Sequence, residues 1–210
     1  MNRLLKFLER ACLIIGLTMI TLGIAVRIDG AVHRQAAVAE FERIRNMSVS
    51  PTDQLNWSEQ RIADYQEALQ QDAGETLAVL RIPSRNIEVP VFDSTNETAL
   101  NRGSGHVTGT SLPGDRGNVA IAAHRDGFFR SLEDIEIGDE IELTTLEGQQ
   151  TFRVSKLDVV DPLNVGVLNP TEDTAITLIT CYPFNYVGAA PDRFIVRATL
   201  INKEKTNERT

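Results

Sequence analysis

The sequence Ala175-Ile176-Thr177-Leu178-Ile179-Thr180-Cys181 is an apolar, β-branched run that ends in a cysteine. Runs of this kind are typical of a buried β-strand. The segment after it leads to Arg193 and to a second apolar run at 194–201. We therefore expect Cys181 where a strand meets a loop, with its thiol facing a groove and its backbone held by sheet pairing.

Similar short runs recur through most of the chain. They cover residues 77–82, 87–92, 119–123, 140–144, 151–160, 175–180 and 194–201. Turns rich in Pro, Gly and Asn separate them, and short helical turns are expected at 96–100 and 128–132. Seven or eight strands at this spacing predict an all-β fold, a closed or nearly closed barrel.

The N-terminus carries an uncharged run, residues 11–26. It is shorter than the ~20 residues that cross a bilayer, but apolar residues before it extend it, and Lys6 and Arg10 can reach the headgroups. The basic residues before the run favour a cytoplasmic N-terminus. We expect residues 1–29 to be a single-pass anchor in the plasma (inner) membrane, with the rest of the chain outside the cytoplasm. A cleaved signal peptide is the alternative, although no small-x-small site follows.

Two helical patterns follow the expected anchor. Apolar residues recur at helical spacing over 31–46, and again over about 56–71, where Asn56 or Ser58 is a plausible cap. We expect residues 30–75 to form a helical stalk or linker, with a regulatory lid as the alternative. The barrel is then expected over 76–202, and residues 203–210 form a polar tail.

Composition limits the classes of function. The formal net charge is −8, and without a basic stripe it argues against a nucleic-acid partner. The acidic residues are scattered and match no EF-hand pattern, so we expect no metal and no cofactor. With Cys12 in the expected anchor, Cys181 has no disulfide partner within the chain. It is therefore either a reactive thiol or a buried one.

The three histidines differ in their surroundings. His33 lies in the membrane-proximal helix, where solvent contact is expected. His106 lies among glycines and is interpreted as a hydrogen-bonded loop residue, a possible supporting group at the site. His124 directly follows the apolar run 119–123. This position is expected to project the imidazole at the edge of the barrel. Asp126 either orients that imidazole or caps the helical turn at Phe128.

Two arginines follow the cysteine strand. If the loop 182–192 joins two antiparallel strands symmetrically, Cys181 faces Arg193 and Thr177 faces Arg197. Arg197 then lies about 13 Å further along the strand, at ~3.3 Å per residue. We therefore expect Arg193 to be the guanidinium beside the thiol.

Together these residues resemble a known family. The pentad at 177–181 is similar to the sortase signature, and Arg193 lies where sortases carry their arginine. The segment 105–110 and the stretch from Pro113 to Arg130, with His124 within it, resemble two further sortase landmarks. The resemblance runs from about residue 77 to residue 200, and 181–186 look most like class D and related sortases.

This resemblance implies an eight-stranded β-barrel and a cysteine transpeptidase. Such enzymes cleave an LPxTG-like C-terminal sorting signal and hold the exported protein as a thioacyl-enzyme. They then pass it to an amine of the cell envelope or of a pilin. Carried over residue by residue, Cys181 is the nucleophile, His124 the general acid/base, and Arg193 positions the substrate and stabilises the oxyanion. Thr180 would help to bind substrate or support the oxyanion site.

Two other functions stay open at this stage. An exported cysteine peptidase would use the same groups but release its product to water. A non-catalytic, membrane-tethered barrel would bind peptides with Cys181 merely buried. The expected partners of the leading hypothesis are exported proteins with a sorting signal, an amine acceptor and the membrane.

Overall fold

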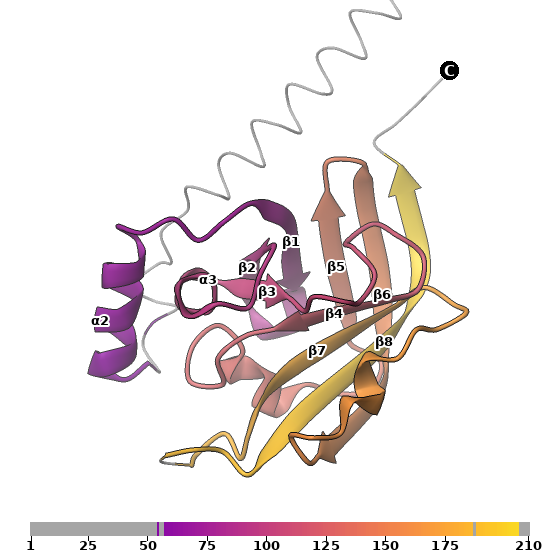
Figure 1. Cartoon of the computed structure of the whole chain (residues 1–210). Coiled ribbons are helices and arrows are strands. Elements are labelled where there is room, and N and C mark those ends of the chain that lie inside the picture. The colour runs from indigo at the N-terminus through magenta and orange to yellow at the C-terminus, as the bar shows by residue number, and fades with distance from the viewer. Residues whose placement is uncertain (1–53, 55–56, 187, 206–210) are drawn as a thin grey trace, which may run out of the picture. The chain divides into compact units, whose positions relative to one another are not determined.

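Within residues 57–186 and 188–205, eight strands close into a barrel in the order β1-β2-β3-β4-β7-β8-β6-β5 (Figure 1). The strands are β1 (Thr76–Ile82), β2 (Ile87–Phe92), β3 (Ser104–His106), β4 (Asn118–Ala122), β5 (Glu140–Thr145), β6 (Gly148–Val160), β7 (Ala175–Tyr182) and β8 (Asp192–Lys205). Most neighbours pair antiparallel, whereas β2 with β3 and β4 with β7 pair parallel. The β1–β5 ladder closes the barrel, so the predicted all-β class and the barrel are confirmed.

The structure is a computed structural model that describes residues 54, 57–186 and 188–205. All of these belong to one unit, Phe41–Asn207. The expected anchor at 1–29 and the first part of the expected stalk lie outside the described residues. Among the helices described, none is long and apolar enough to cross a membrane.

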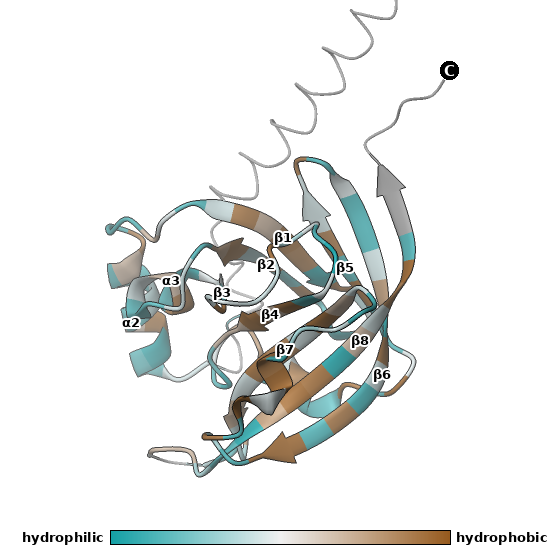
Figure 2. Ribbon diagram, turned by 45° about the vertical axis from the view of Figure 1, so that its right-hand side comes forward, coloured by the Kyte–Doolittle hydropathy of each residue, from teal (hydrophilic) through white to brown (hydrophobic). Residues whose placement is uncertain are grey.

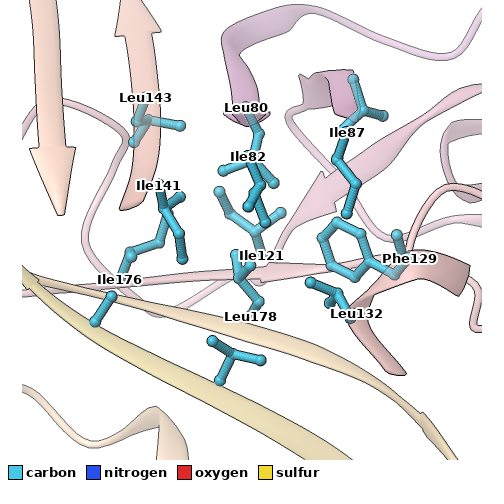
Figure 3. Close-up of a cluster of buried hydrophobic side chains, with 14 of the residues drawn as sticks. Leu80, Ile82, Ile87, Ile121, Phe129, Leu132, Ile141, Leu143, Ile176 and Leu178 are labelled. Atoms are coloured by element: carbon cyan, nitrogen blue, oxygen red, sulfur yellow. The ribbon is translucent and has the colours of Figure 1, made fainter. Parts of the chain in front are cut away.

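Alternation along the strands builds the core. On β5, outward and buried positions alternate from Glu140 to Thr145, and β6 shows bands of both kinds in Figure 2. The inward side chains of β1, β4, β5 and β7 meet in one cluster, which Phe129 and Leu132 join from outside the strands (Figure 3). Fully burying one such side chain contributes roughly 1.5–3 kcal/mol. The buried cluster therefore fixes the strands whose ends carry the site.

Short helices occupy the connections. They are α2 (Glu59–Ala68), α3 (Glu97–Arg102) and the 3₁₀ turns η1 (Pro83–Arg85), η2 (Arg130–Asp134) and η3 (Val165–Leu168). The Ser58 side chain accepts from the Arg61 amide at the start of α2, so Ser58 is the cap rather than Asn56. Asn96 caps α3 in the same way. The helices α2 and α3 pack against each other (Figure 1).

Three elements differ from the sequence-based expectation. The strand β3 was missed because three residues are too few for a periodic pattern, and Gly105 lies so close to the Ser94 carbonyl that no Cβ fits. The helical turn expected at 128–132 is η2, which begins two residues later. The last strand covers Asp192–Lys205 rather than the expected 194–201 and so extends into the expected polar tail, because it pairs with β6 as far as Gly148.

Candidate active site

The antiparallel β7–β8 ladder places Cys181 directly opposite Arg193. The same ladder pairs Thr177 with Arg197, so the predicted register is confirmed. Cys181 and Arg193 share the outer face because Ile176 and Leu178, at the alternate positions, point into the core. Cys181 is a free, partly exposed thiol. A nucleophile and a cation therefore lie side by side at the end of the barrel wall.

The Arg193 guanidinium is partly held by its own loop. Its Nη1 donates to the carbonyl of Asp192 at 2.9 Å and to that of Ala190 at 3.4 Å. These two contacts hold the planar guanidinium against its own loop. Arginine carries five N–H groups, so Arg193 keeps other donors for a further acceptor. This geometry suits a residue that receives a carbonyl or an oxyanion.

His124 reaches the same end of the barrel from β4. The parallel β4–β7 ladder pairs Ala122 with Ile179, and the Ala123 amide then donates to the Ile179 carbonyl at 3.2 Å. Because β4 and β7 run parallel, His124, two residues beyond the end of β4, lies at the same edge of the barrel as Cys181 near the end of β7. The structure thus places Cys181, His124 and Arg193 at one edge of the barrel, and their catalytic roles stay a prediction.

Thr180 joins the two strands below the site. Its hydroxyl donates to the Ala123 carbonyl at 2.8 Å, and the side chain is only 2% exposed. It points to the face opposite Cys181, so the hydroxyl is used inside the protein and not at the groove. The expected contact of this side chain with substrate is not what the geometry provides. Thr180 instead fixes the main chain immediately before His124.

Charged side chains surround the imidazole of His124. Its Nε2 has no hydrogen-bond partner in the described part of the chain, and Glu97 Oε1 lies 3.6 Å away. Burial lowers the pKa of His124 below its usual 6.5, and the Arg61 cation lowers it further. Glu97, Asp126 and Asp64 oppose this by attracting positive charge. The balance favours the neutral imidazole, the form that can accept a proton from a thiol.

Asp126 has neither of the two roles that its local sequence suggested, which were to orient the imidazole of His124 or to cap the following helical turn. No side-chain hydrogen bond caps η2, because the Asp126 carboxylate instead pairs with Arg61 of α2. The Asp126 Oδ1 to Arg61 Nη2 distance is 3.1 Å. Asp126 therefore acts on His124 through charge and through Arg61, rather than through a hydrogen bond to the imidazole.

His106 is a structural group. It lies on β3, opposite Ile121 of β4, and is buried. Its Nε2 lies 3.0 Å from the Ser111 carbonyl and 3.1 Å from the Thr110 hydroxyl. Ile121 comes three residues before His124, about 10 Å along the strand. His106 is thus hydrogen-bonded, as predicted. It lies in a strand rather than in a loop, and at a distance from Cys181.

Two arginines from the loop after β4 hold the loop after β7. Arg125 donates to the carbonyls of Pro183, Tyr186 and Gly188 at 3.1, 2.8 and 3.0 Å. Arg130 donates to the Phe184 carbonyl at 2.9 Å. The loop that follows Cys181 is therefore tied to the loop that carries His124.

A cavity of about 260 Å³ opens on the outer face of the barrel beneath η3. Side chains of β6 and β8 form its floor, including Ile195 and Arg197, and η3 contributes Gly166 and Val167. Ile195 and Arg197 share the outward face of β8 with Arg193. No cluster of three or more potential metal-ligating side chains occurs among residues 57–186 and 188–205.

The family model of the sortase domain matches residues 80–201, more than half of the chain. The chain belongs to the sortase family. Sortase D of Bacillus subtilis is 33% identical over 126 residues, which cover 60% of this chain and 64% of that protein. Sortase A of Listeria monocytogenes is 32% identical over 114 residues, covering 52% of this chain and 51% of that protein.

Solved sortase structures share the fold. A Clostridium perfringens sortase D5 transpeptidase has 27% sequence identity and a TM-score of 0.57, covering 72% of this chain and 93% of that one. Sortase A of L. monocytogenes has 28% identity and a TM-score of 0.58, covering 65% of this chain and 93% of that one. The resemblance drawn from the pentad is thereby confirmed at the level of the family. Sortases are cysteine transpeptidases. The matches to these two curated relatives, sortase D of B. subtilis and sortase A of L. monocytogenes, span less than two thirds of each relative's length.

The sequence did not single out every charged group at this sortase site. Arg61 and Glu97 carry no local signal, because their contacts depend on how separate elements pack. Arg125 stands next to His124 and within the stretch that resembles sortases, so its position was a usable clue. Its target, however, is a set of carbonyls whose place in the fold no sequence pattern reveals.

Proposed function

We propose that this chain is a membrane-anchored sortase that acts as a cysteine transpeptidase on exported proteins. It would cleave an LPxTG-like C-terminal sorting signal and transfer the protein to an amine acceptor of the cell envelope or of a pilin. One observation carries the proposal: Cys181 lies opposite Arg193 in the β7–β8 ladder, with His124 at the end of the adjoining strand β4. Thiol, imidazole and guanidinium are the groups that acyl transfer through a thioester requires.

The first half-reaction forms the thioester. Cys181 loses its proton to neutral His124, and the sulfur attacks the carbonyl carbon of the scissile amide. Arg193 donates to the oxygen that gains negative charge, which stabilises the tetrahedral intermediate. The C–N bond then breaks, and the leaving amine takes the proton from the imidazolium of His124. The exported protein stays attached to Cys181.

The second half-reaction returns the enzyme to its starting state. An acceptor amine attacks the thioester carbon, and His124 removes a proton from that amine. Arg193 again supports the oxyanion, the C–S bond breaks, and the sulfur takes the proton back from His124. A new amide bond joins the acceptor to the exported protein, so atoms and protons balance over the cycle.

The cavity beneath η3 is suited to the peptide that precedes the scissile bond. It shares the outward face of β8 with Arg193, and Ile195 on its floor offers an apolar surface. A peptide lying along this face would reach Cys181 at its carboxyl end. We assign the cavity to these substrate residues.

The membrane location is part of the same proposal. The uncharged run at 11–26 and the basic residues that precede it support a single-pass anchor with a cytoplasmic N-terminus. The catalytic barrel would then face the outside of the plasma membrane, where exported proteins and envelope amines meet.

Mass spectrometry of the full chain in detergent micelles tests the function. The purified protein is incubated with a small library of sorting-signal peptides, with and without an added amine such as triglycine. We expect a mass adduct on Cys181, release of the fragment after the scissile bond, and an amide product only when amine is present. Cys181→Ala should abolish all three signals.

Two results would reject the proposal in favour of its alternatives. Equal amounts of hydrolysed product with and without amine, and no amide product, would indicate a cysteine peptidase. Peptide binding without adduct or cleavage, together with a thiol that resists labelling, would indicate a non-catalytic barrel.

A further inference from the structure

The helix α2 precedes the barrel but is docked onto the loop that carries His124. The Trp57 ring packs edge-on against Phe128 with ring centres 5.0 Å apart, and against Tyr65 at 5.8 Å. Tyr65 is 1% exposed. An aromatic contact of this geometry adds roughly 0.5–1.5 kcal/mol beyond burial. The first turn of α2 is therefore fixed beside the residues that follow His124.

Arg61 extends from this first turn into the same corner. Its side chain is 11% exposed, and its guanidinium donates to Asn101 at the C-terminal end of α3 and pairs with Asp126. An arginine held at two points by different elements presents its charge in a fixed position. Arg61 thus links α2, α3 and the loop after β4.

The Arg61 side chain lies against the turn that begins at His124. A Cβ built on Gly127 would be 3.5 Å from Arg61 Cδ and 3.7 Å from His124 Cβ. Both Arg61 Nε and His124 Nε2 are buried without a hydrogen-bond partner in the described part of the chain. The guanidinium of Arg61 and the imidazole of His124 therefore share one corner, where the positive charge of Arg61 disfavours a second positive charge on the imidazole.

We propose that Arg61 is a positioning residue of the transpeptidase, because its guanidinium, held by Asn101 and Asp126, fixes the turn that carries His124 and places a positive charge beside it. This inference rests on the proposed function and adds α2, a segment outside the barrel, to the catalytic machinery. Asp126 has two opposed effects, since it holds Arg61 in place and also attracts positive charge to His124. Glu97 of α3 and Asp64 of α2 are the remaining charged groups that act on the imidazole.

Nuclear magnetic resonance titration of the histidine ring signals in the full chain tests this directly. The chain has three histidines, so His124→Gln assigns the signal of interest and His106 serves as an internal reference. We expect Arg61→Met, which keeps the stem but removes the charge, to raise the titration midpoint of His124. Glu97→Gln, which removes the carboxylate 3.6 Å from His124 Nε2, should lower it.

The pH profile of peptide transfer gives the second readout. If neutral His124 accepts the thiol proton, Arg61→Met shifts the acid limb of kcat/KM to higher pH. The expected loss is about fivefold at the acid end and little at the alkaline plateau. Arg61→Lys, which keeps a charge without the planar fork, should lie between wild type and Arg61→Met. Arg102→Met is the matched control: Arg102 also joins α3 to the end of α2, through the Gln71 carbonyl.

The outcomes separate this inference from the proposed function. An unchanged His124 midpoint in Arg61→Met, or shifts in the same direction in Arg61→Met and Glu97→Gln, would overturn the role of Arg61. A general loosening of the structure would shift the His124 midpoint in the same direction in both variants. The titration does not require turnover, so a wild-type chain that forms no adduct on Cys181 rejects the function but leaves this test intact. Should Arg61→Met fail to fold, Arg61→Lys and Glu97→Gln still decide the matter by the sign of their shifts.

Discussion

The two halves of the site are built in different ways. Cys181 and Arg193 belong to one continuous antiparallel ladder, the β7–β8 wall, whose register fixes both residues at once. His124 lies in a corner formed by the loop 123–129 with α2 and α3, where Arg61, Glu97 and Asp126 come from three separate elements. The wall depends on backbone pairing, whereas the corner depends on side-chain charges. A small change therefore perturbs the His124 corner more easily than the β7–β8 wall.

Arg193→Lys is expected to have the largest effect on the wall. A lysine keeps the charge but not the planar fork, so kcat/KM for peptide transfer should fall about 100-fold, the size of losing a preorganised oxyanion donor. Arg197→Lys, on the same face and paired with Thr177, should reduce it by less than about tenfold. Steady-state kinetics of both variants measure this, and equal losses would contradict the assignment of Arg193.

Asp139→Asn should lower the stability of the barrel and leave the His124 corner unchanged. Burial works to raise the pKa of Asp139, but the Glu136 amide and the Arg85 guanidinium lower it overall. Losing these charged hydrogen bonds, at 2.8–3.0 Å to Arg85, should decrease the free energy of unfolding by about 2 kcal/mol at neutral pH. Urea unfolding measures the loss, and kcat/KM at low temperature should stay unchanged.

The contribution of Asp139 to the free energy of unfolding should depend on pH. Because the folded pKa of Asp139 is lowered, its stabilisation is present above the unfolded value of 3.8 and is lost as pH falls through the folded pKa. The difference between wild type and Asp139→Asn should therefore shrink in acid. Asp158→Asn is the control, since Asp158 pairs with Lys156 at the exposed surface. A large loss of stability in that control would count against the interpretation.

Thr180→Val tests how the β7–β8 wall supports the His124 corner. Valine matches the shape of threonine but cannot donate to the Ala123 carbonyl, so stability should fall by about 1 kcal/mol. His124 loses its fixed backbone, and kcat/KM should fall about tenfold through misplacement. Thr177→Val is a matched control on the same strand, where the hydroxyl donates to Asn118 Oδ1 at 2.7 Å. Equal losses of activity in both variants would remove the special role of Thr180.

The smallest expected effect is the acid response of the corner. The folded pKa of His124 is lowered, so the folded state binds fewer protons than the unfolded chain. The free energy of unfolding should therefore fall as pH drops from the unfolded value near 6.5 toward the folded pKa. Chemical unfolding at a series of pH values should show a weaker fall in His124→Gln. A fall of the same size in both proteins would show that other groups cause it.

The wall was largely predictable from sequence, and the corner was not. An apolar run that ends in Cys181, a loop, and a second run that begins beside Arg193 define an antiparallel pair whose register follows from symmetry. The strand before His124 was found by the same periodicity. The short strand β3 escaped because its small residues serve close backbone contact rather than core packing.

The contacts of the corner arise from tertiary packing. Arg61 is 65 residues from Asp126 in the chain, and no local pattern indicates that the two side chains meet. Asp126 followed by Phe128 suggested a cap, yet a buried cation proved the better partner for the carboxylate. The predicted anchor at 1–29 remains a prediction, because it lies outside the described residues.

The manner in which Arg125 and Arg130 hold the loop after Cys181 bears on which substitutions this loop tolerates. Their acceptors are mostly main-chain carbonyls, at Pro183, Phe184, Tyr186 and Gly188. Every residue type supplies such a carbonyl, so side chains along this segment can be exchanged while the anchoring persists. Side chains that recognise a different substrate can therefore replace those of this loop without loss of the hydrogen bonds that hold it, provided that the two guanidinium groups are retained.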